Sequence, residues 1–165
     1  MNRGARRQAI FYDDDDRTLF LRILAVADEL HAIDLHAYCL MGNHYHLLVH
    51  TPLGELAPFM KFLGQTYTQR FNRRHGYDGA LFRGRYHSEL IEDDQHLLAT
   101  VRYIHRNPCA AAICGTPDEY AWSSMASYTN ANRNPGWLKT GTILDLFGGV
   151  EPFARSMRLP DDAAA

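Results

Sequence analysis

The stretch LMGNHYHLLV, residues 40–49, joins a turn signal to an apolar run that carries two histidines. Gly42 and Asn43 are typical of a tight hairpin turn, so the segments on either side are expected to pair as antiparallel strands. IDLHAYCLM, residues 33–41, is compact and partly alternating, and it predicts the first of these strands. HYHLLVHT, residues 44–51, predicts the returning strand.

The two histidines of this strand are candidate metal ligands. Residues two apart in a strand point to the same face, so His44 and His46 are expected to project side by side while Tyr45 points into packing. Two neutral imidazoles can bind one divalent cation if a third ligand is supplied. The alternative is a pair of hydrogen-bonded histidines near a strand end, and an HxH pattern alone does not separate the two.

Helical periodicity flanks the hairpin. Residues 14–31 begin with acids and repeat apolar side chains at helical spacing, which predicts a helix. Residues 54–76 predict a second helix, ended by Gly76. DDQHLLATVRYIHRNP, residues 93–108, predicts a third, and its proline is expected to mark the end.

Shorter segments complete the expected fold. RYHSELIE, residues 85–92, alternates and predicts a third strand, while EYAWSSMASY, residues 119–128, is expected to pack on the core. TGTILDLFG, residues 140–148, predicts a short helix after a loop. The order helix, strand, strand, helix, strand, helix indicates one α+β domain with a small antiparallel sheet.

Composition excludes several classes of protein. The chain has 165 residues, of which 46% are apolar and 22% charged, as in ordinary globular domains. We expect no membrane partner, because no run of about 18 apolar residues is present. The first residues lack the apolar core of a signal peptide, so export is not expected. The odd cysteine count, without a CxxC pair, argues against a disulfide scaffold and favours the cytoplasm.

The net charge of −2 hides a basic segment over residues 61–86. Six basic side chains against one acidic side chain give this segment a net charge of +5. It is either a phosphate-binding surface or a solvated helix face, and charge alone does not decide. The basic residues are Lys61, Arg70, Arg73, Arg74, Arg83 and Arg85.

A second pair of polar residues lies on the third predicted helix. Tyr103 and Asn107 are four residues apart and therefore share a helical face, away from the apolar stripe that includes Val101 and Ile104. This arrangement is consistent with an exposed nucleophile beside a metal ligand. It is equally consistent with a surface tyrosine and a helix-terminal asparagine.

The amino-acid sequences of four segments together resemble a known protein family. LHAYCLMGNHYHLLVHTP, FNRRHGYDGALFRGRYHSELIED, VRYIHRNPCAAAIC and YAWSSMASY follow one another in this order. Together they resemble the REP-associated tyrosine transposases, a branch of the single-tyrosine HUH transposase superfamily. The resemblance covers roughly residues 2–128, which implies a catalytic domain over 1–128 and a partly flexible C-terminal extension over 129–165.

The resemblance implies a specific site. His44 and His46 match the metal-binding histidine pair, Tyr103 matches the catalytic tyrosine, and Asn107 matches the position that completes a Mg²⁺ or Mn²⁺ site. The implied activity is cleavage and joining of single-stranded or hairpin DNA through a 5′-phosphotyrosine intermediate. The base that would deprotonate the tyrosine is not identified; a metal-bound water and His105 are the candidates.

The basic segment then acquires a role. We expect Arg70, Arg73, Arg74, Arg83 and Arg85 to contact DNA phosphates, and Tyr86, with Tyr67 and Phe82, to stack on unpaired bases. Relatives act as monomers or dimers, so a homodimer is one expected assembly. Two alternatives remain: a module that binds single-stranded or hairpin nucleic acid without cutting it, and a histidine-ligated metal hydrolase with a small substrate.

The resemblance also implies a ferredoxin-like α+β fold, in which the first strand has too few residues in this chain. Family members usually carry an N-terminal strand before the NRG stretch, which here is residues 2–4. We therefore expect the first strand to be missing or truncated, with its place taken by a partner's strand or in part by residues 5–12. An unfilled central position would expose unpaired strand edges.

Overall fold

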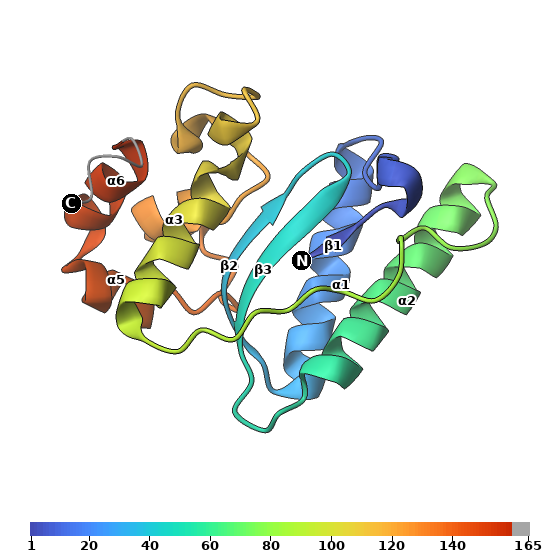
Figure 1. The fold of residues 1–165 in the computed structure, drawn as a ribbon, viewed down its shortest axis with the longest axis horizontal. Coiled ribbons are helices and arrows are strands. Elements are labelled where there is room, and N and C mark those ends of the chain that lie inside the picture. Colours follow the sequence, from blue (N-terminus) through green and yellow to red (C-terminus); the bar gives the residue numbers. More distant parts are fainter. Residues whose placement is uncertain (160–165) are drawn as a thin grey trace.

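The fold is built on the predicted hairpin. In the computed structural model, which describes residues 1–159, β2 (Asp34–Leu40) and β3 (His44–His50) pair antiparallel. A two-residue strand, β1 (Asn2–Arg3), pairs with the other edge of β3, so the sheet order is β1-β3-β2 (Figure 1). The chain is therefore α+β with an antiparallel sheet, as the sequence predicts.

The short β1 occupies a central position. Residues 81–87 run along its outer side and are tied to residues 1–5 by backbone hydrogen bonds. Three of these join the Ala5 amide to the Leu81 carbonyl, Arg83 to Arg3 and His87 to Met1, each at 2.9 Å. The spatial order is thus residues 81–87, β1, β3, β2, the order of a ferredoxin-like sheet. The first strand is therefore present and two residues long.

The strand predicted over residues 85–92 is wrong. Only Phe82, outside that range, forms an isolated bridge, with Gly4. Backbone hydrogen bonds to the N-terminal segment end at His87, and residues 88–90 are exposed coil. The alternating pattern has no strand edge to pair with there, and an isolated extended segment gains no ladder hydrogen bonds.

Three long helices enclose the sheet. α1 (Asp14–His31) and α2 (Leu56–His75) pack against each other, and α3 (Asp94–Ala110) contacts β2 and β3. Figure 1 shows α1 and α2 on one side of the hairpin and α3 on the other. The Asp13 side chain caps α1 and the Asp93 side chain caps α3, each accepting from an amide three residues on.

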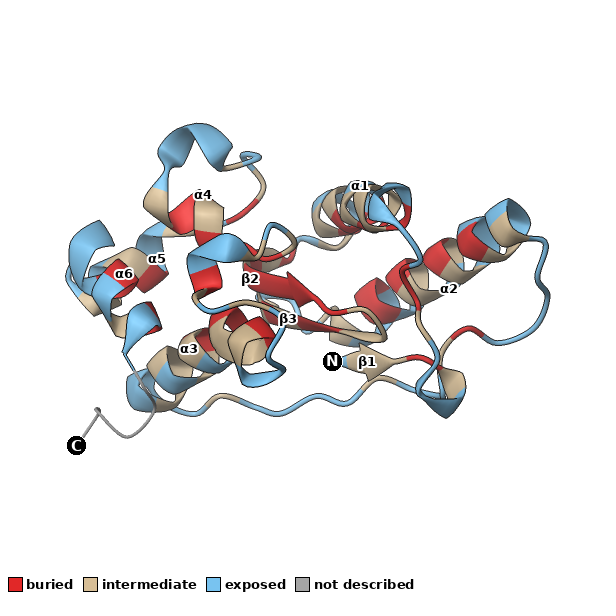
Figure 2. Cartoon of the chain, turned by 90° about the horizontal axis from the view of Figure 1, so that it is seen from above, coloured by how far each residue is buried: buried red, intermediate tan, exposed pale blue. Residues whose placement is uncertain are grey.

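The core lies between the hairpin and the helices. The Tyr45 ring is fully buried and lies 4.7 Å from that of Phe20, centroid to centroid, on the side covered by α1 and α2. Tyr67 is also fully buried, and its hydroxyl donates to the Ile10 carbonyl at 2.5 Å. Figure 2 shows the buried residues concentrated on β2, β3 and bands along the helices.

The third helix is longer than predicted. It continues through the buried Pro108 to Ala110, and the amides of Ala111 and Ile113 donate to the Asn107 and Pro108 carbonyls at its end. The thiols of the three cysteines are free. No helix among residues 1–159 is long and apolar enough to cross a membrane.

The C-terminal segment adds short helices. These are α4 (Met125–Thr129), the predicted α5 (Gly141–Phe147) and the unpredicted α6 (Val150–Arg158). Both α5 and α6 pack on α3. The 3-10 turns are η1 (Ala5–Arg7), η2 (Pro117–Glu119) and η3 (Ala131–Arg133). Part of the expected flexible extension, residues 160–165, lies outside the described residues.

Candidate active site

Strand β3 presents both histidines on the face covered by α3. The rings of His44 and His46 are 5.0 Å apart, centroid to centroid, at an interplanar angle of 81°. His44 is half-buried and His46 is buried, while Tyr45 between them points into the opposite core. The alternation of the strand therefore places the imidazoles side by side, as the sequence predicts.

Helix α3 brings the tyrosine and the asparagine to the same place. Val101 and Ile104 are buried and seat the helix on the sheet, whereas the Tyr103 side chain is 58% exposed. The Tyr103 ring nevertheless lies 5.3 Å from the His46 ring, edge to face at 86°. One turn later, the Asn107 side chain lies near enough to His44 to raise its pKa. All four predicted residues converge within one chain.

The electrostatics of the site keep both imidazoles neutral. Burial lowers the pKa of His46 to about 3, and the neighbouring His44 and Arg3 act in the same direction. Burial also lowers the pKa of His44, with a further contribution from Arg3, while the Asn107 side chain acts in the opposite direction. A neutral imidazole has a free lone pair, which is the form that binds metal ions.

The donor set suits a cation. The Nε2 atom of His46 is buried and makes no hydrogen bond within the described chain, which leaves an expensive unsatisfied group unless a ligand fills it. Among residues 1–159, no cluster of three His, Cys, Asp or Glu side chains is placed to hold a metal ion. Two imidazoles and the Asn107 amide oxygen are therefore the protein groups available for one.

Two further residues belong to this site, and sequence reasoning missed both. The Asn43 side-chain oxygen accepts a hydrogen bond from Nδ1 of His44 at 2.7 Å. The Nε2 atom of His44 is therefore the ring nitrogen that keeps a free lone pair. Arg3 pairs with His44 across β1 and β3 and adds positive charge to the site. In the sequence, Asn43 indicates only a turn. Arg3 lies outside the basic segment, and only the pairing of β1 with β3 brings Arg3 beside His44.

The predicted DNA-contacting residues divide into two groups. Arg70, Arg73, Arg83 and Arg85 are exposed, and Tyr86 is half-buried against the core. Arg74 instead makes ion pairs with Asp13 at 2.7 Å and with the buried Asp16, and it ties α2 to the start of α1. Arg74 is thus exposed but already ion-paired, and its contact with DNA stays a prediction. Tyr67 is a core residue and is not available for stacking.

The structure also decides against one candidate base. His105 is fully buried, and its ring nitrogens lie 3.0 Å from the Val101 carbonyl and 2.8 Å from the Ser124 hydroxyl. Burial lowers its pKa to about 4. A side chain enclosed in this way cannot accept the proton of an exposed phenol on the other side of the helix.

Comparison with known proteins agrees with this geometry. The family model for IS200-like transposases matches residues 1–107. The chain belongs to the IS200-like transposase family. The match includes all four converging residues and ends at Asn107. No curated protein sequence matches the chain of this IS200-like transposase.

A solved structure shares the fold. It is described as a REP-associated tyrosine transposase bound to a REP hairpin, and it is similar with a TM-score of 0.66 and 14% sequence identity. The alignment covers 81% of this IS200-like transposase and 78% of the other chain. At this identity the likeness concerns the arrangement of the backbone, and the side chains described above carry the functional argument.

Proposed function

We propose that this IS200-like transposase cuts and rejoins single-stranded or hairpin DNA with Tyr103 as the nucleophile. The observation that carries the proposal is the contact between the exposed Tyr103 ring and the buried His46 ring, from two elements far apart in sequence. In phosphoryl transfer, the phenol can serve as the nucleophile, while the two neutral imidazoles and the amide can hold a metal ion.

His44, His46 and Asn107 are the residues that would hold a Mg²⁺ or Mn²⁺ ion. Bound there, the ion would neutralise charge on the non-bridging oxygens of the scissile phosphate. Three protein ligands leave coordination positions for phosphate and water, as Mg²⁺ sites in phosphoryl-transfer enzymes usually do. Asn43 would keep His44 in the tautomer that this role requires.

The reaction is a transesterification. The Tyr103 oxygen loses its proton to solvent, which the exposure of the side chain permits, and forms a bond to the scissile phosphorus. The bond from phosphorus to the 3′ oxygen breaks, and that oxygen takes a proton from solvent. The products are a 5′-phosphotyrosine link and a free 3′-hydroxyl. Because the link keeps the energy of the broken phosphodiester, a second hydroxyl can rejoin the DNA without ATP.

DNA is the substrate that the surface favours. Arg70, Arg73, Arg83 and Arg85 are exposed and basic, and guanidinium groups bind phosphates strongly. The structure with the similar fold is bound to a REP hairpin, so a hairpin with unpaired flanking nucleotides is the first substrate to test. A surface of this kind is not needed by a metal hydrolase with a small substrate.

The test is covalent capture. The protein is incubated with labelled hairpin and single-stranded oligonucleotides in the presence of Mn²⁺, and a denaturant-resistant protein–DNA complex is expected. Tyr103→Phe is expected to bind the DNA but form no such complex. If the wild-type protein binds the hairpin yet never becomes attached, the chain is a non-catalytic nucleic-acid-binding module and the proposal is wrong.

A further inference from the structure

Two adjacent hollows lie at the tip of the β2–β3 hairpin, outside the catalytic residues. The first is lined by Ala5, Arg6, Arg7 and Arg83. The second, of about 620 Å³, is lined by nine residues that include Gln8, Tyr12 and Tyr77. Residues 5–7 and 83 line the first hollow and residues 8, 80 and 81 line the second, so the same two segments of the chain contribute to both.

The first hollow is a concentrated positive site. Among residues 1–159, the guanidinium groups of Arg6, Arg7 and Arg83 make no ion pair with a carboxylate. Three unneutralised cations around one hollow repel one another, and this cost is relieved when an anion binds. A phosphate group suits the fork geometry of guanidinium donors.

The backbone of this site is held in a costly conformation. Arg6 and Arg7 both have positive φ, 53° and 62°, which costs about 1 kcal/mol or more for each non-glycine residue. Gly4 allows the turn, because a Cβ there would lie 2.2 Å from the Gln8 carbonyl oxygen. Asn43 secures it by donating to the Arg7 carbonyl at 3.0 Å. Backbone strain of this kind is typically found where a ligand is bound.

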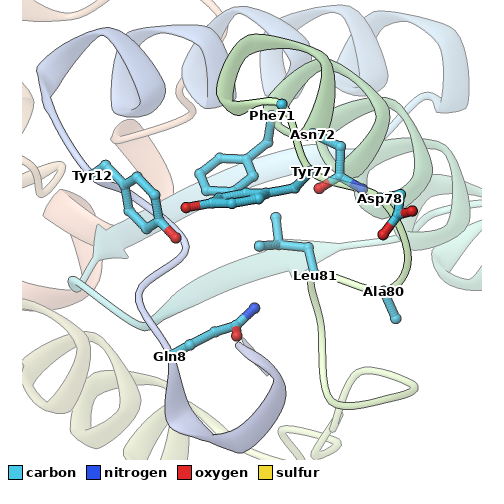
Figure 3. Close-up of a pocket in the computed structure, with 9 residues that line it drawn as sticks. Gln8, Tyr12, Phe71, Asn72, Tyr77, Asp78, Ala80 and Leu81 are labelled. Carbon is cyan, nitrogen blue, oxygen red and sulfur yellow. The ribbon is translucent and has the colours of Figure 1, made fainter.

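The second hollow has a different chemistry. Tyr12 and Tyr77 are 49% and 52% exposed, and their rings lie 6.2 Å apart between centroids, edge to face at 81°. Figure 3 shows these two rings meeting at one side of the opening, with Gln8 opposite and Asp78 at the far end. The buried Leu81 lies between them.

This mixture of groups suits a nucleobase better than a second phosphate. Exposed tyrosine rings offer stacking surfaces for a planar base, and Gln8 and Asp78 offer hydrogen-bonding groups for its edge. The Asp78 carboxylate would repel an anion, and among residues 1–159 it makes no ion pair. The first hollow therefore suits the phosphate of a nucleotide, and the second suits its base.

We propose that the paired hollows bind one unpaired nucleotide of the DNA, with its phosphate at Arg6, Arg7 and Arg83 and its base against Tyr12 and Tyr77. This subsite rests on the proposed function in so far as it assumes a DNA substrate. It joins directly to the catalytic face, because Asn43 contacts both the Arg7 carbonyl and His44. A strand held here is led past the hairpin tip toward the imidazoles.

The test compares the DNA affinities of the full chain and its variants. The measurements are made without divalent cation, so that DNA cleavage does not affect the measured affinity. The probes are a fluorescein-labelled DNA hairpin with a short single-stranded extension, the same hairpin with abasic residues in the extension, and the blunt hairpin. Tyr77→Ala is expected to weaken binding of the extended hairpin about tenfold, the value of one base–aromatic stack. Tyr77→Phe, which keeps the ring, is expected to bind like the wild type.

The abasic and blunt probes decide the assignment. The wild type is expected to bind the abasic extension about tenfold more weakly than the normal one, with no further loss in Tyr77→Ala. Tyr12→Ala provides a second variant with the same expected pattern, and Arg83→Ala is expected to weaken both extended probes. The proposal is overturned if Tyr77→Ala and Tyr12→Ala bind the normal extension like the wild type, or lose equal affinity for the blunt hairpin.

Failure of the subsite and failure of the proposed function remain distinguishable. Base-dependent binding without any covalent capture by Tyr103 supports the subsite and overturns the catalytic proposal. Covalent capture with unchanged binding in both tyrosine variants supports catalysis and overturns the subsite. A wild-type chain that binds none of the three probes overturns both.

Discussion

The rings of His46 on β3 and Tyr103 on α3 lie edge to face, 5.3 Å apart between centroids. His46 is buried and its Nε2 has no hydrogen-bond partner in the described chain, whereas Tyr103 is 58% exposed. An unsatisfied imidazole nitrogen thus lies beside an accessible phenol.

Replacement of His46 is expected to remove the cation site. His46→Ala deletes one of two imidazole donors, so the affinity for Mn²⁺, measured by calorimetry, is expected to fall by more than about tenfold. His50→Ala is the matched control, because His50 lies on the same face of β3 but is exposed and hydrogen-bonds Asp34. Equal Mn²⁺ affinities in the two variants would contradict the assignment of His46 as a ligand.

Asn43 is expected to act on the metal through His44. Asn43→Ala removes the acceptor for Nδ1, so Mn²⁺ affinity is expected to fall by about tenfold, as for other residues that orient a ligand histidine. Asn43→Asp keeps an acceptor and is expected to recover most of the affinity. If Asn43→Asp is as defective in Mn²⁺ binding as Asn43→Ala, the role of Asn43 is confined to the turn.

Arg73 and Arg74 are neighbours with different expected roles. Arg73 is exposed, so Arg73→Ala is expected to weaken hairpin binding and to reduce the slope of log affinity against log salt by about 1, with Tm unchanged. Arg74 is paired with Asp13 and the buried Asp16, so Arg74→Ala is expected to lower Tm. Titrations at several salt concentrations and thermal unfolding measure both effects. The opposite pattern would show that the two roles are exchanged.

The stability of the fold is expected to fall in acid. The pKa of His105 is about 4 in the folded chain, because burial disfavours the charged ring, against 6.5 ordinarily. Below about pH 6.5 the unfolded chain binds a proton that the folded chain does not, so the unfolding free energy falls by about 3 kcal/mol between pH 6.5 and 4. His46 acts in the same direction.

Denaturant unfolding at a series of pH values checks this expectation. In His105→Gln, which removes the titrating group but keeps a polar side chain, the loss of unfolding free energy between pH 6.5 and 4 is expected to be smaller by about 3 kcal/mol. A pH dependence identical to that of the wild type would mean that His105 does not titrate as its burial indicates.

Much of this site was predictable because local periodicity determines it. A strand places His44 and His46 on one face, and a helix places Tyr103 and Asn107 on one face, whatever surrounds them. What periodicity does not give is that the two faces meet. That meeting depends on the packing of α3 on β2 and β3, and the family resemblance supplied the expectation before the structure confirmed it.

The errors arose where tertiary packing overrides local signals. Alternation over residues 85–92 predicted a strand, but no edge is free to pair with most of it. Pro108 predicted a helix end, but α3 continues two residues beyond it and is closed by backbone hydrogen bonds from Ala111 and Ile113. The ion pairs of Arg74 were not predicted, because only the structure brings the acids at the start of α1 to it. Arg3 was missed for the converse reason, since only strand pairing brings it to His44.

One measurement tests the central claim most directly. The covalent complex formed in Mn²⁺ with a hairpin labelled on the 3′ side of the scissile phosphate is digested with protease and nuclease, and the modified peptide is sequenced by mass spectrometry. The account predicts a nucleotide attached through its 5′-phosphate to Tyr103, in the peptide that contains the sequence RYIHRNP. Attachment at any other residue, or through a 3′-phosphate, would contradict it.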